Sequence, residues 1–351
     1  MISDKPELNH KYKRAIKYIV SILLSLVFLY FAFQNVNVTT VFDYIANASL
    51  FWIIIFLLVN LSSHFIRAIR WKIILHSVKP DTSLKNLFGA IMVGYGVNCV
   101  VPRLGEVSRA VMVGKWEGLS RSSMFGAVIV ERVIDIIFLA LSVVASAILW
   151  SENLYEKFPW LKATVFLSFI LMGLVILFFY LMIKFKEKFY GVIIKFVGKI
   201  SANLGQKAAY IFEMVTMGFS SLKGTKNYLF TIILSIVIML VYGLDSYIGF
   251  FAIGLQQIKP VSFEMGWIVM TISAIGVVIP TPGGTGSYHV LATSALVLLF
   301  GFSQDLSLAY AVLTHGVTYF LFIFSALIVY FVIDKQHDNF FKIAEKELDK
   351  L

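Results

Sequence analysis

The sequence predicts an all-α, polytopic membrane protein with about six full transmembrane helices and two re-entrant hairpins in an inverted repeat. Composition is the first reason, because 59% of the 351 residues are hydrophobic and 14% are charged, whereas soluble domains carry about 25% charged residues. Length is the second, because apolar runs of about 18 residues or more recur, and each can cross about 30 Å of hydrocarbon. The third reason is that Pro and Gly interrupt two apolar stretches at equivalent places.

The apolar runs define the expected elements in order. The full spans should cover residues 15–33, 49–66, 123–149, 161–183, 228–251 and 307–333. Shorter apolar pieces at 84–101, 264–279 and 288–300 flank the interruptions and should be the half-helices of the hairpins. We expect a single integral membrane domain over residues 1–351. Its first inverted half should cover about 12–150 and its second about 160–333, with a basic insertion at 184–226 and a tail at 334–351.

Lys and Arg gather in alternate connecting segments, and this pattern predicts the orientation. Residues 1–17, 67–121, 184–226 and those after 334 are rich in them, whereas 34–48 contains none. Both termini should therefore be cytoplasmic in a multi-pass protein of the cell (inner) membrane. The formal net charge of +10 is then explained by anionic lipid headgroups, so we expect no nucleic-acid partner.

The two interruptions mark the expected substrate site. The first covers residues 98–106 and the second covers residues 280–286. Unwound backbone at membrane depth is tolerated only where it lines a cavity, so paired interruptions are typical of transporters. The two breaks should approach the bilayer midplane from opposite sides, and we expect Gly105 and Gly284 to line one cavity.

Two arginines flank a glutamate at the helix start that follows the first interruption. A helix N-terminus presents free N–H groups and a partial positive charge, which suit an anion such as phosphate. Arg103 and Arg109 can bind phosphate bidentately, and Glu106 is spaced to orient Arg109 as an i,i+3 pair. The alternative is that these arginines only anchor the cytoplasmic side.

Charged groups inside the spans cost about 2.5–3.5 kcal/mol each on insertion scales, so they usually pair or carry function. Glu131 and Asp135 share a face of the third span, and Arg132 can pair with Asp135. Arg103 or Arg109 would neutralise the remaining negative charge. The cluster is either a structural ion pair or part of a headgroup site.

Asp245, in the fifth span, is a solitary carboxylate, which is typical of a functional or proton-carrying group inside a membrane. His289 and His315 are weaker signals, since a lone histidine is more often a packing residue, although His and Asp can pass protons near neutral pH. The predicted substrate-binding residues are Asn98, Arg103, Glu106, Arg109, Glu131, Arg132, Asp135, Asp245, Gly283, Gly284, Gly286, His289 and His315.

No catalytic constellation is visible in the sequence. There is no HExxH, no P-loop and no nucleophile elbow, and a single cysteine, Cys99, excludes an internal disulfide and a thiolate zinc cluster. We therefore expect no metal, no cofactor and no enzyme activity. Two alternatives stay open: an intramembrane transferase that uses Glu131 and Asp135 as acid and base, and a non-transporting accessory subunit.

Taken in order, several segments resemble the membrane region of lysylphosphatidylglycerol synthases, a flippase-like family of integral membrane proteins. The segments are residues 67–71, 98–109, 131–135 and 280–286, and the resemblance covers about residues 12–333. It implies that a phospholipid or a lipid-linked intermediate moves between leaflets, with anionic or lipid-linked membrane lipids as partners. A homo-oligomer is compatible with it.

The chain departs from that family in two respects. It lacks the cytoplasmic aminoacyl-transferase domain that would follow the membrane region, so lipid synthesis is not expected. Residues 287–289 read Ser-Tyr-His where family members often have a glutamate after the Gly-rich turn. The resemblance therefore does not imply a cationic headgroup.

Overall fold

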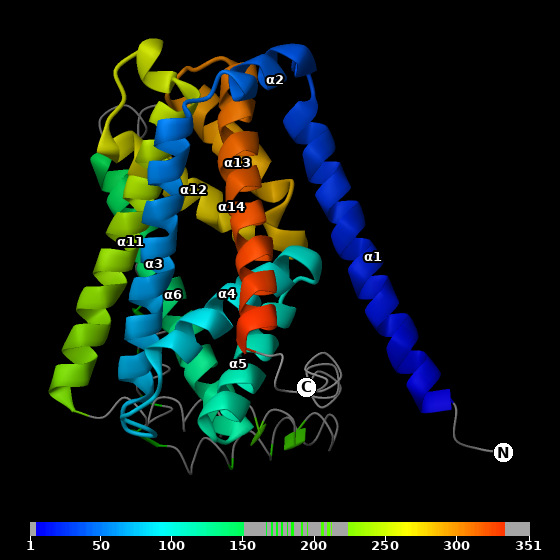
Figure 1. Ribbon diagram of the computed structural model, residues 1–351, viewed down its shortest axis with the longest axis vertical. Coiled ribbons are helices and arrows are strands. Elements are labelled where there is room, and N and C mark those ends of the chain that lie inside the picture. The colour runs from blue at the N-terminus through cyan, green and yellow to red at the C-terminus, as the bar shows by residue number, and fades with distance from the viewer. Residues whose placement is uncertain are drawn as a thin grey trace. The chain divides into compact units, whose positions relative to one another are not determined.

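The computed structural model of the chain describes residues 5–150 and 224–333, together with scattered residues between 166 and 212 (Figure 1). Within these residues the regular structure is helical, which confirms the predicted all-α class. The tail at 334–351 lies outside the described residues, as do most of the fourth predicted span at 161–183 and most of the basic insertion at 184–226.

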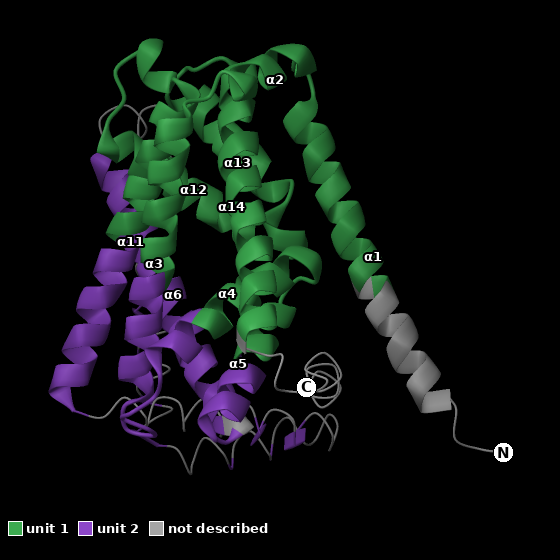
Figure 2. Cartoon of the chain, viewed as in Figure 1, with its two compact units in different colours: residues 1–64, 89–109, 240–350 green, residues 65–88, 110–239, 351 purple. Residues whose placement is uncertain are grey.

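The chain forms two compact units, which Figure 2 colours separately. Unit 1 comprises residues 1–64, 89–109 and 240–350, and unit 2 comprises residues 65–88, 110–239 and 351. The boundaries fall inside helices α3 (Leu50–Leu75), α4 (Leu84–Val100), α5 (Leu104–Glu117) and α11 (Thr225–Ile253). Each unit draws on both predicted halves of the chain, and the inverted repeat stays a prediction.

Three of the described helices are long and apolar enough to cross a membrane: α3, α11 and α14 (Gln304–Ile333). Helix α1 (Lys5–Phe33) meets the short helix α2 (Val38–Ala46) at 90°, and this bent pair is a fourth candidate if it forms one span. Helix α6 (Arg121–Leu149) occupies the third predicted span and contains the charged cluster. The chain is therefore a multi-pass membrane protein, while the number of six spans stays a prediction.

Both interruptions separate short helices at the predicted places. The first lies between α4 and α5. The second lies between α12 (Phe263–Val278) and α13 (Ser287–Ser294), with a 3-10 turn at Pro282–Gly284 and a π-helical turn at Ala295–Leu299 after α13. Serine side chains fix two helix starts, because Ser120 Oγ accepts the Ser123 N–H of α6 and Ser262 Oγ accepts the Met265 N–H of α12.

Glycine allows each pair of short helices to pack closely. A Cβ added to Gly105 of α5 would lie 1.9 Å from the carbonyl oxygen of Gly94 on α4. A Cβ added to Gly276 of α12 would lie 2.8 Å from the carbonyl oxygen of Ser287 on α13. A larger residue at either glycine would push backbone against backbone, so packing requires glycine there.

Helix α2 lies in the segment 34–48, which was expected to be only a connection between spans. It packs on α14 within unit 1 (Figure 1). Two hydrogen bonds fix the junction of α1 and α2 to the start of α14. Gln304 Nε2 donates to the Gln34 carbonyl oxygen at 2.8 Å, and the Asn37 N–H donates to Asp305 Oδ1 at 3.0 Å. This contact positions α1 beside the second helix break, where it packs on α13.

Candidate functional site

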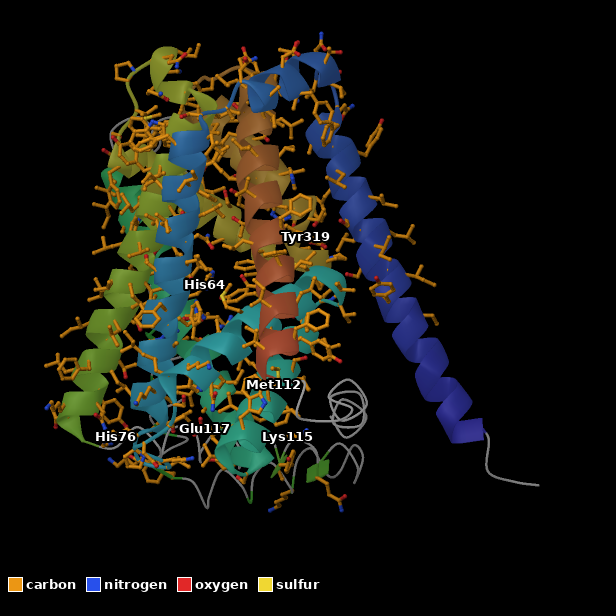
Figure 3. The ribbon with its side chains drawn as sticks, in the orientation of Figure 1. His64, His76, Met112, Lys115, Glu117 and Tyr319 are labelled. Carbon is orange, nitrogen blue, oxygen red and sulfur yellow. The ribbon has the colours of Figure 1, made fainter. Side chains whose placement is uncertain are left out.

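The two helix breaks meet inside unit 1. Gly283, in the second break, has a φ of 57°, and a Cβ added to it would lie 2.8 Å from Tyr319 Cε2 and 3.3 Å from Cys99 Cα. Tyr319 of α14, labelled in Figure 3, donates its hydroxyl to the carbonyl oxygen of Cys99 near the end of α4. The first break therefore contacts the second through Cys99, Tyr319 and Gly283.

Asn98 organises the first break. Its Oδ1 accepts the Gly105 N–H at 2.7 Å, and its Nδ2 donates to Glu106 Oε2 at 3.3 Å. The Asn98 side chain thus accepts one of the free N–H groups at the N-terminus of α5. Fewer N–H donors are then left there for a phosphate. Arg103 is exposed and has a φ of 65°, a left-handed conformation that is uncommon outside glycine, whereas Arg109 is buried.

Serine hydroxyls of α1 bind the unwound carbonyls of the second break. Ser21 Oγ donates to the Pro280 carbonyl oxygen at 2.6 Å, and Ser25 Oγ donates to the Thr285 carbonyl oxygen at 2.8 Å. Gly286, with a φ of 89°, packs so closely on α1 that an added Cβ would lie 2.6 Å from the Ser25 carbonyl oxygen. Because unsatisfied carbonyls in hydrocarbon are costly, α1 stabilises this break. Sequence reasoning missed both serines, although two serines four residues apart in an apolar span were a signal.

His289 and His315 lie together beside the second break, with ring centroids 4.7 Å apart. His289 Nδ1 accepts the Gly286 N–H at 3.2 Å, and His315 Nε2 lies 3.3 Å from Thr285 Oγ1. The Tyr288 ring stacks on His315 with a centroid distance of 5.2 Å. The sequence named each histidine separately, and the structure makes them neighbours at one break.

The expectation that Gly105 and Gly284 line one cavity stays a prediction, and the structure shows what each glycine packs against. Gly105 faces Gly94 of its own hairpin, and a Cβ added to Gly284 would lie 3.3 Å from Val277 Cγ2 of the preceding helix. Both glycines therefore serve packing within their own hairpins. The glycine that lies at the contact between the breaks is Gly283.

In unit 2, arginines of α3 hold the two carboxylates of α6. Arg67 Nη1 lies 2.8 Å from Glu131 Oε1 and 2.7 Å from Asp135 Oδ2. Arg70 Nη2 lies 2.5 Å from Asp135 Oδ1 and 3.5 Å from Glu131 Oε1. Arg132 contacts Asp135 Oδ2 at 3.3 Å, which confirms the predicted i,i+3 pair.

Arg67 and Arg70 are partners that the sequence did not predict for these carboxylates. The contribution expected from Arg103 or Arg109 stays a prediction. The five described residues of these ion pairs, Arg67, Arg70, Arg132, Glu131 and Asp135, carry a formal net charge of +1 (3 − 2). From the sequence, Arg67 and Arg70 were noted only as part of a family pattern. Their i,i+3 spacing at the end of an apolar span was a signal that they share a helix face.

Asp245 also has a partner that sequence reasoning missed. Asn60 of α3 donates from Nδ2 to Asp245 Oδ2 at 2.9 Å, and both residues are buried within unit 1. Among the described residues, no group of three or more His, Cys, Asp or Glu is arranged to hold a metal ion.

Apolar spanning helices and two breaks between short helices define a multi-pass α-helical membrane protein. The chain belongs to the family of the lysylphosphatidylglycerol synthase TM region, whose model matches residues 18–326. This result confirms the family named from the sequence.

Two curated relatives are UPF0104 membrane proteins. The chain is 23% identical over 220 residues to one from Methanocaldococcus jannaschii, a match that covers 59% of this chain and 62% of the relative. It is 30% identical over 109 residues to one from Methanothermobacter thermautotrophicus, covering 29% and 31% respectively. The chain thus spans less than two thirds of the length of either relative. No solved structure matches the chain.

Proposed function

We propose that this protein moves a phospholipid or a lipid-linked intermediate between the leaflets of the inner membrane. The observation that carries the proposal is the contact between the two helix breaks at Cys99, Tyr319 and Gly283. Broken helices are the places where transporters bind polar substrates within the membrane. Membership of the lysylphosphatidylglycerol synthase TM family supports a lipid as the substrate class.

The polar groups beside these breaks suit a lipid headgroup. The second break offers His315 and Thr285, and the first offers Asn98 and the exposed Arg103. Hydroxyl, amide, imidazole and guanidinium groups can bind a phosphate or a sugar headgroup. The acyl chains can stay in the bilayer, so only the headgroup has to cross.

The transferase alternative receives less support from the charged cluster. A general acid and base must be able to reach the substrate and exchange a proton with it. Glu131 is fully buried, and Arg67 and Arg70 already bind both carboxylates of the cluster. We assign Glu131, Arg132 and Asp135 a structural role, in which they stabilise the helices that carry the site. We also propose that both chain termini are cytoplasmic.

Leaflet transfer of acyl-labelled phosphatidylglycerol in vesicles that contain the purified protein tests the proposal. Gly283→Ala introduces a Cβ that meets Tyr319 Cε2 at 2.8 Å, so it should slow transfer about tenfold or more, a barrier change of about 1.4 kcal/mol. Gly118→Ala is the matched control, because Gly118 has a φ of 65° and an added Cβ would meet nothing within 4 Å. Both variants carry a backbone strain of about 1–2 kcal/mol.

Two results would contradict the proposal. One is a wild-type transfer rate no higher than that of protein-free vesicles. The other is equal transfer by well-folded Gly283→Ala and Gly118→Ala proteins, which would show that the contact between the breaks is not part of the lipid path. A non-transporting accessory subunit would give the first result.

A further inference from the structure

Asn60 and Asp245 form a buried amide–carboxyl pair inside unit 1. Asn60 lies in α3 and Asp245 lies in α11, and both helices are membrane-spanning candidates. The residues are 7% and 8% exposed, and Asn60 Nδ2 donates to Asp245 Oδ2 at 2.9 Å. An amide is a neutral donor, so this hydrogen bond does not neutralise an ionised carboxylate.

Among the residues that the structure describes, none donates a hydrogen bond to two oxygens of the pair, Asn60 Oδ1 and Asp245 Oδ1. A buried acceptor without a donor is unfavourable, and an ionised carboxylate inside a membrane is more so. Binding of one proton converts the Asp245 carboxylate to a neutral carboxylic acid. The new O–H bond supplies a donor at a place where acceptors outnumber donors.

Phenols from two further helices accompany this pair. The Tyr310 hydroxyl of α14 lies 2.9 Å from Ser246 Oγ, and it donates to the Ser246 carbonyl oxygen at 3.1 Å. The Tyr288 hydroxyl of α13 lies 3.0 Å from Thr314 Oγ1. Tyr310 therefore contacts the residue that follows Asp245 on α11. A phenol is uncharged near neutral pH, so neither supplies a positive countercharge.

The other elements of unit 1 complete the surroundings. Helix α12 places the rings of Phe263 and Trp267 beside Gly243 of α11, two residues before Asp245. On α3, His64 (Figure 3) lies one turn after Asn60 and packs against aromatic rings. These neighbours are mainly apolar or aromatic.

Tyr288 links this pair to the second helix break. Its ring stacks on His315, which contacts the His289 ring and lies 3.3 Å from Thr285 Oγ1 of the break. Groups that titrate therefore extend from the carboxyl to the site proposed for the lipid headgroup. Histidine and a carboxyl can exchange protons within the physiological range.

We infer that Asp245, paired with Asn60, binds a proton whose uptake and release are coupled to lipid movement at the second break. The coupling rests on the proposed function, whereas proton binding does not. Ca²⁺ or Mg²⁺ is a poorer occupant, because these ions take about six oxygen ligands or more. The pair offers two oxygens without donors.

Infrared difference spectroscopy of the purified full chain in lipid tests proton binding directly. The carbonyl stretch of a protonated carboxyl should appear at low pH and vanish at higher pH in the wild type. Asp245→Asn should lose this band, and Asp245→Glu should retain one at a shifted frequency. Asp43→Asn is the control, because Asp43 is exposed on α2, and it should keep the wild-type band.

Vesicles that contain labelled phosphatidylglycerol and a pH gradient test the coupling. Wild-type transfer should respond to the gradient, and Asp245→Asn, whose amide mimics the protonated acid, should keep its thermal midpoint and lose the response. A carboxyl band that is absent or insensitive to pH would overturn the inference. Transfer that depends on Na⁺ at constant pH would overturn the identity of the ion.

The two proposals fail separately in these experiments. Wild-type transfer that ignores the gradient would remove the coupling and leave lipid transfer in place. Absence of any transfer, together with a titrating Asp245 band, would remove the proposed function and leave the proton site. If Asp245→Asn does not fold, the frequency shift expected for Asp245→Glu still decides proton binding.

Discussion

Arg70 binds Asp135 with 2.5 Å between Nη2 and Oδ1, and the arginine side chain is completely buried. The same guanidinium donates from Nη1 to Ser235 Oγ of α11 at 2.9 Å. Arg70 therefore connects α3, α6 and α11 within unit 2. A planar guanidinium with several donors can do this, whereas the single ammonium of lysine cannot match its geometry.

Replacement of Arg70 by alanine should be severely destabilising. Removal of one partner of a buried ion pair typically costs about 3–5 kcal/mol, because the other charge stays buried. Arg132→Ala should lower the free energy of unfolding by about 1 kcal/mol or less. The Arg132 side chain is 34% exposed, so its ion pair with Asp135 resembles one at a protein surface. Thermal unfolding of the two variants in detergent measures the difference.

The double variant Arg70→Met with Asp135→Leu serves as the control for this charge effect. It removes both charges and should recover much of the stability that Arg70→Ala loses. Equal thermal midpoints for Arg70→Ala and Arg132→Ala would show that the buried guanidinium has no special role.

Tyr319→Phe removes the hydroxyl that bonds to the Cys99 carbonyl oxygen while it keeps the ring. We expect a loss of about 1 kcal/mol in stability and slower lipid transfer, because the carbonyl loses its donor at the contact between the breaks. Tyr330→Phe is the control, since Tyr330 is 44% exposed on the same helix. Unchanged stability and transfer in Tyr319→Phe would contradict the importance of this hydrogen bond.

Glu117, labelled in Figure 3, makes stability depend on acid pH. Burial acts to raise the pKa of its carboxyl, but hydrogen bonds from Lys79, the Asn86 amide and the Ser83 backbone N–H prevail, and the pKa lies below its ordinary value of 4.5. A carboxyl whose folded pKa is lowered stabilises the fold above its unfolded pKa and loses that effect as pH falls through the folded pKa.

Thermal midpoints of the wild type and Glu117→Gln should therefore differ at pH 7 and converge as the pH falls below about 4. The hydrogen bond with Glu117 raises the pKa of Lys79, so Lys79 stays protonated over this acid range and its deprotonation removes the same interaction only at alkaline pH. Asp43→Asn, at an exposed position, is the control for the removal of one carboxylate. A gap that widens on acidification would reverse the assigned sign.

The proposed orientation predicts which positions react with an impermeant thiol reagent in intact cells. In a Cys99→Ser background, a cysteine at the exposed Thr39 of α2 should react from outside. A cysteine at Lys207, in the basic insertion, should react only after the membrane is permeabilised. Reaction of the Lys207 position in intact cells would refute the orientation and the inverted repeat built on it.

Local sequence signals predicted the short helices well, because Pro and Gly mark the ends of these helices in the sequence. The predicted half-helices 84–101, 264–279 and 288–300 correspond to α4, α12 and α13 with its π-helical turn. Their apolar runs end at Pro and Gly, which break helices through the backbone itself. The i,i+3 pair of Arg132 with Asp135 was also predictable, because one helix fixes its geometry.

The sequence by itself determined the membrane class, the helical content, the places of the breaks and the charged residues that need partners, since composition and local backbone chemistry control these properties. Only the tertiary structure decided that Asn60 meets Asp245, that Arg67 and Arg70 hold Glu131 and Asp135, and that Gly283 meets Tyr319. The physical reason is that helices apolar all round carry little pattern to say which face packs where. These contacts join residues far apart along the chain, so side-chain packing between helices selects them.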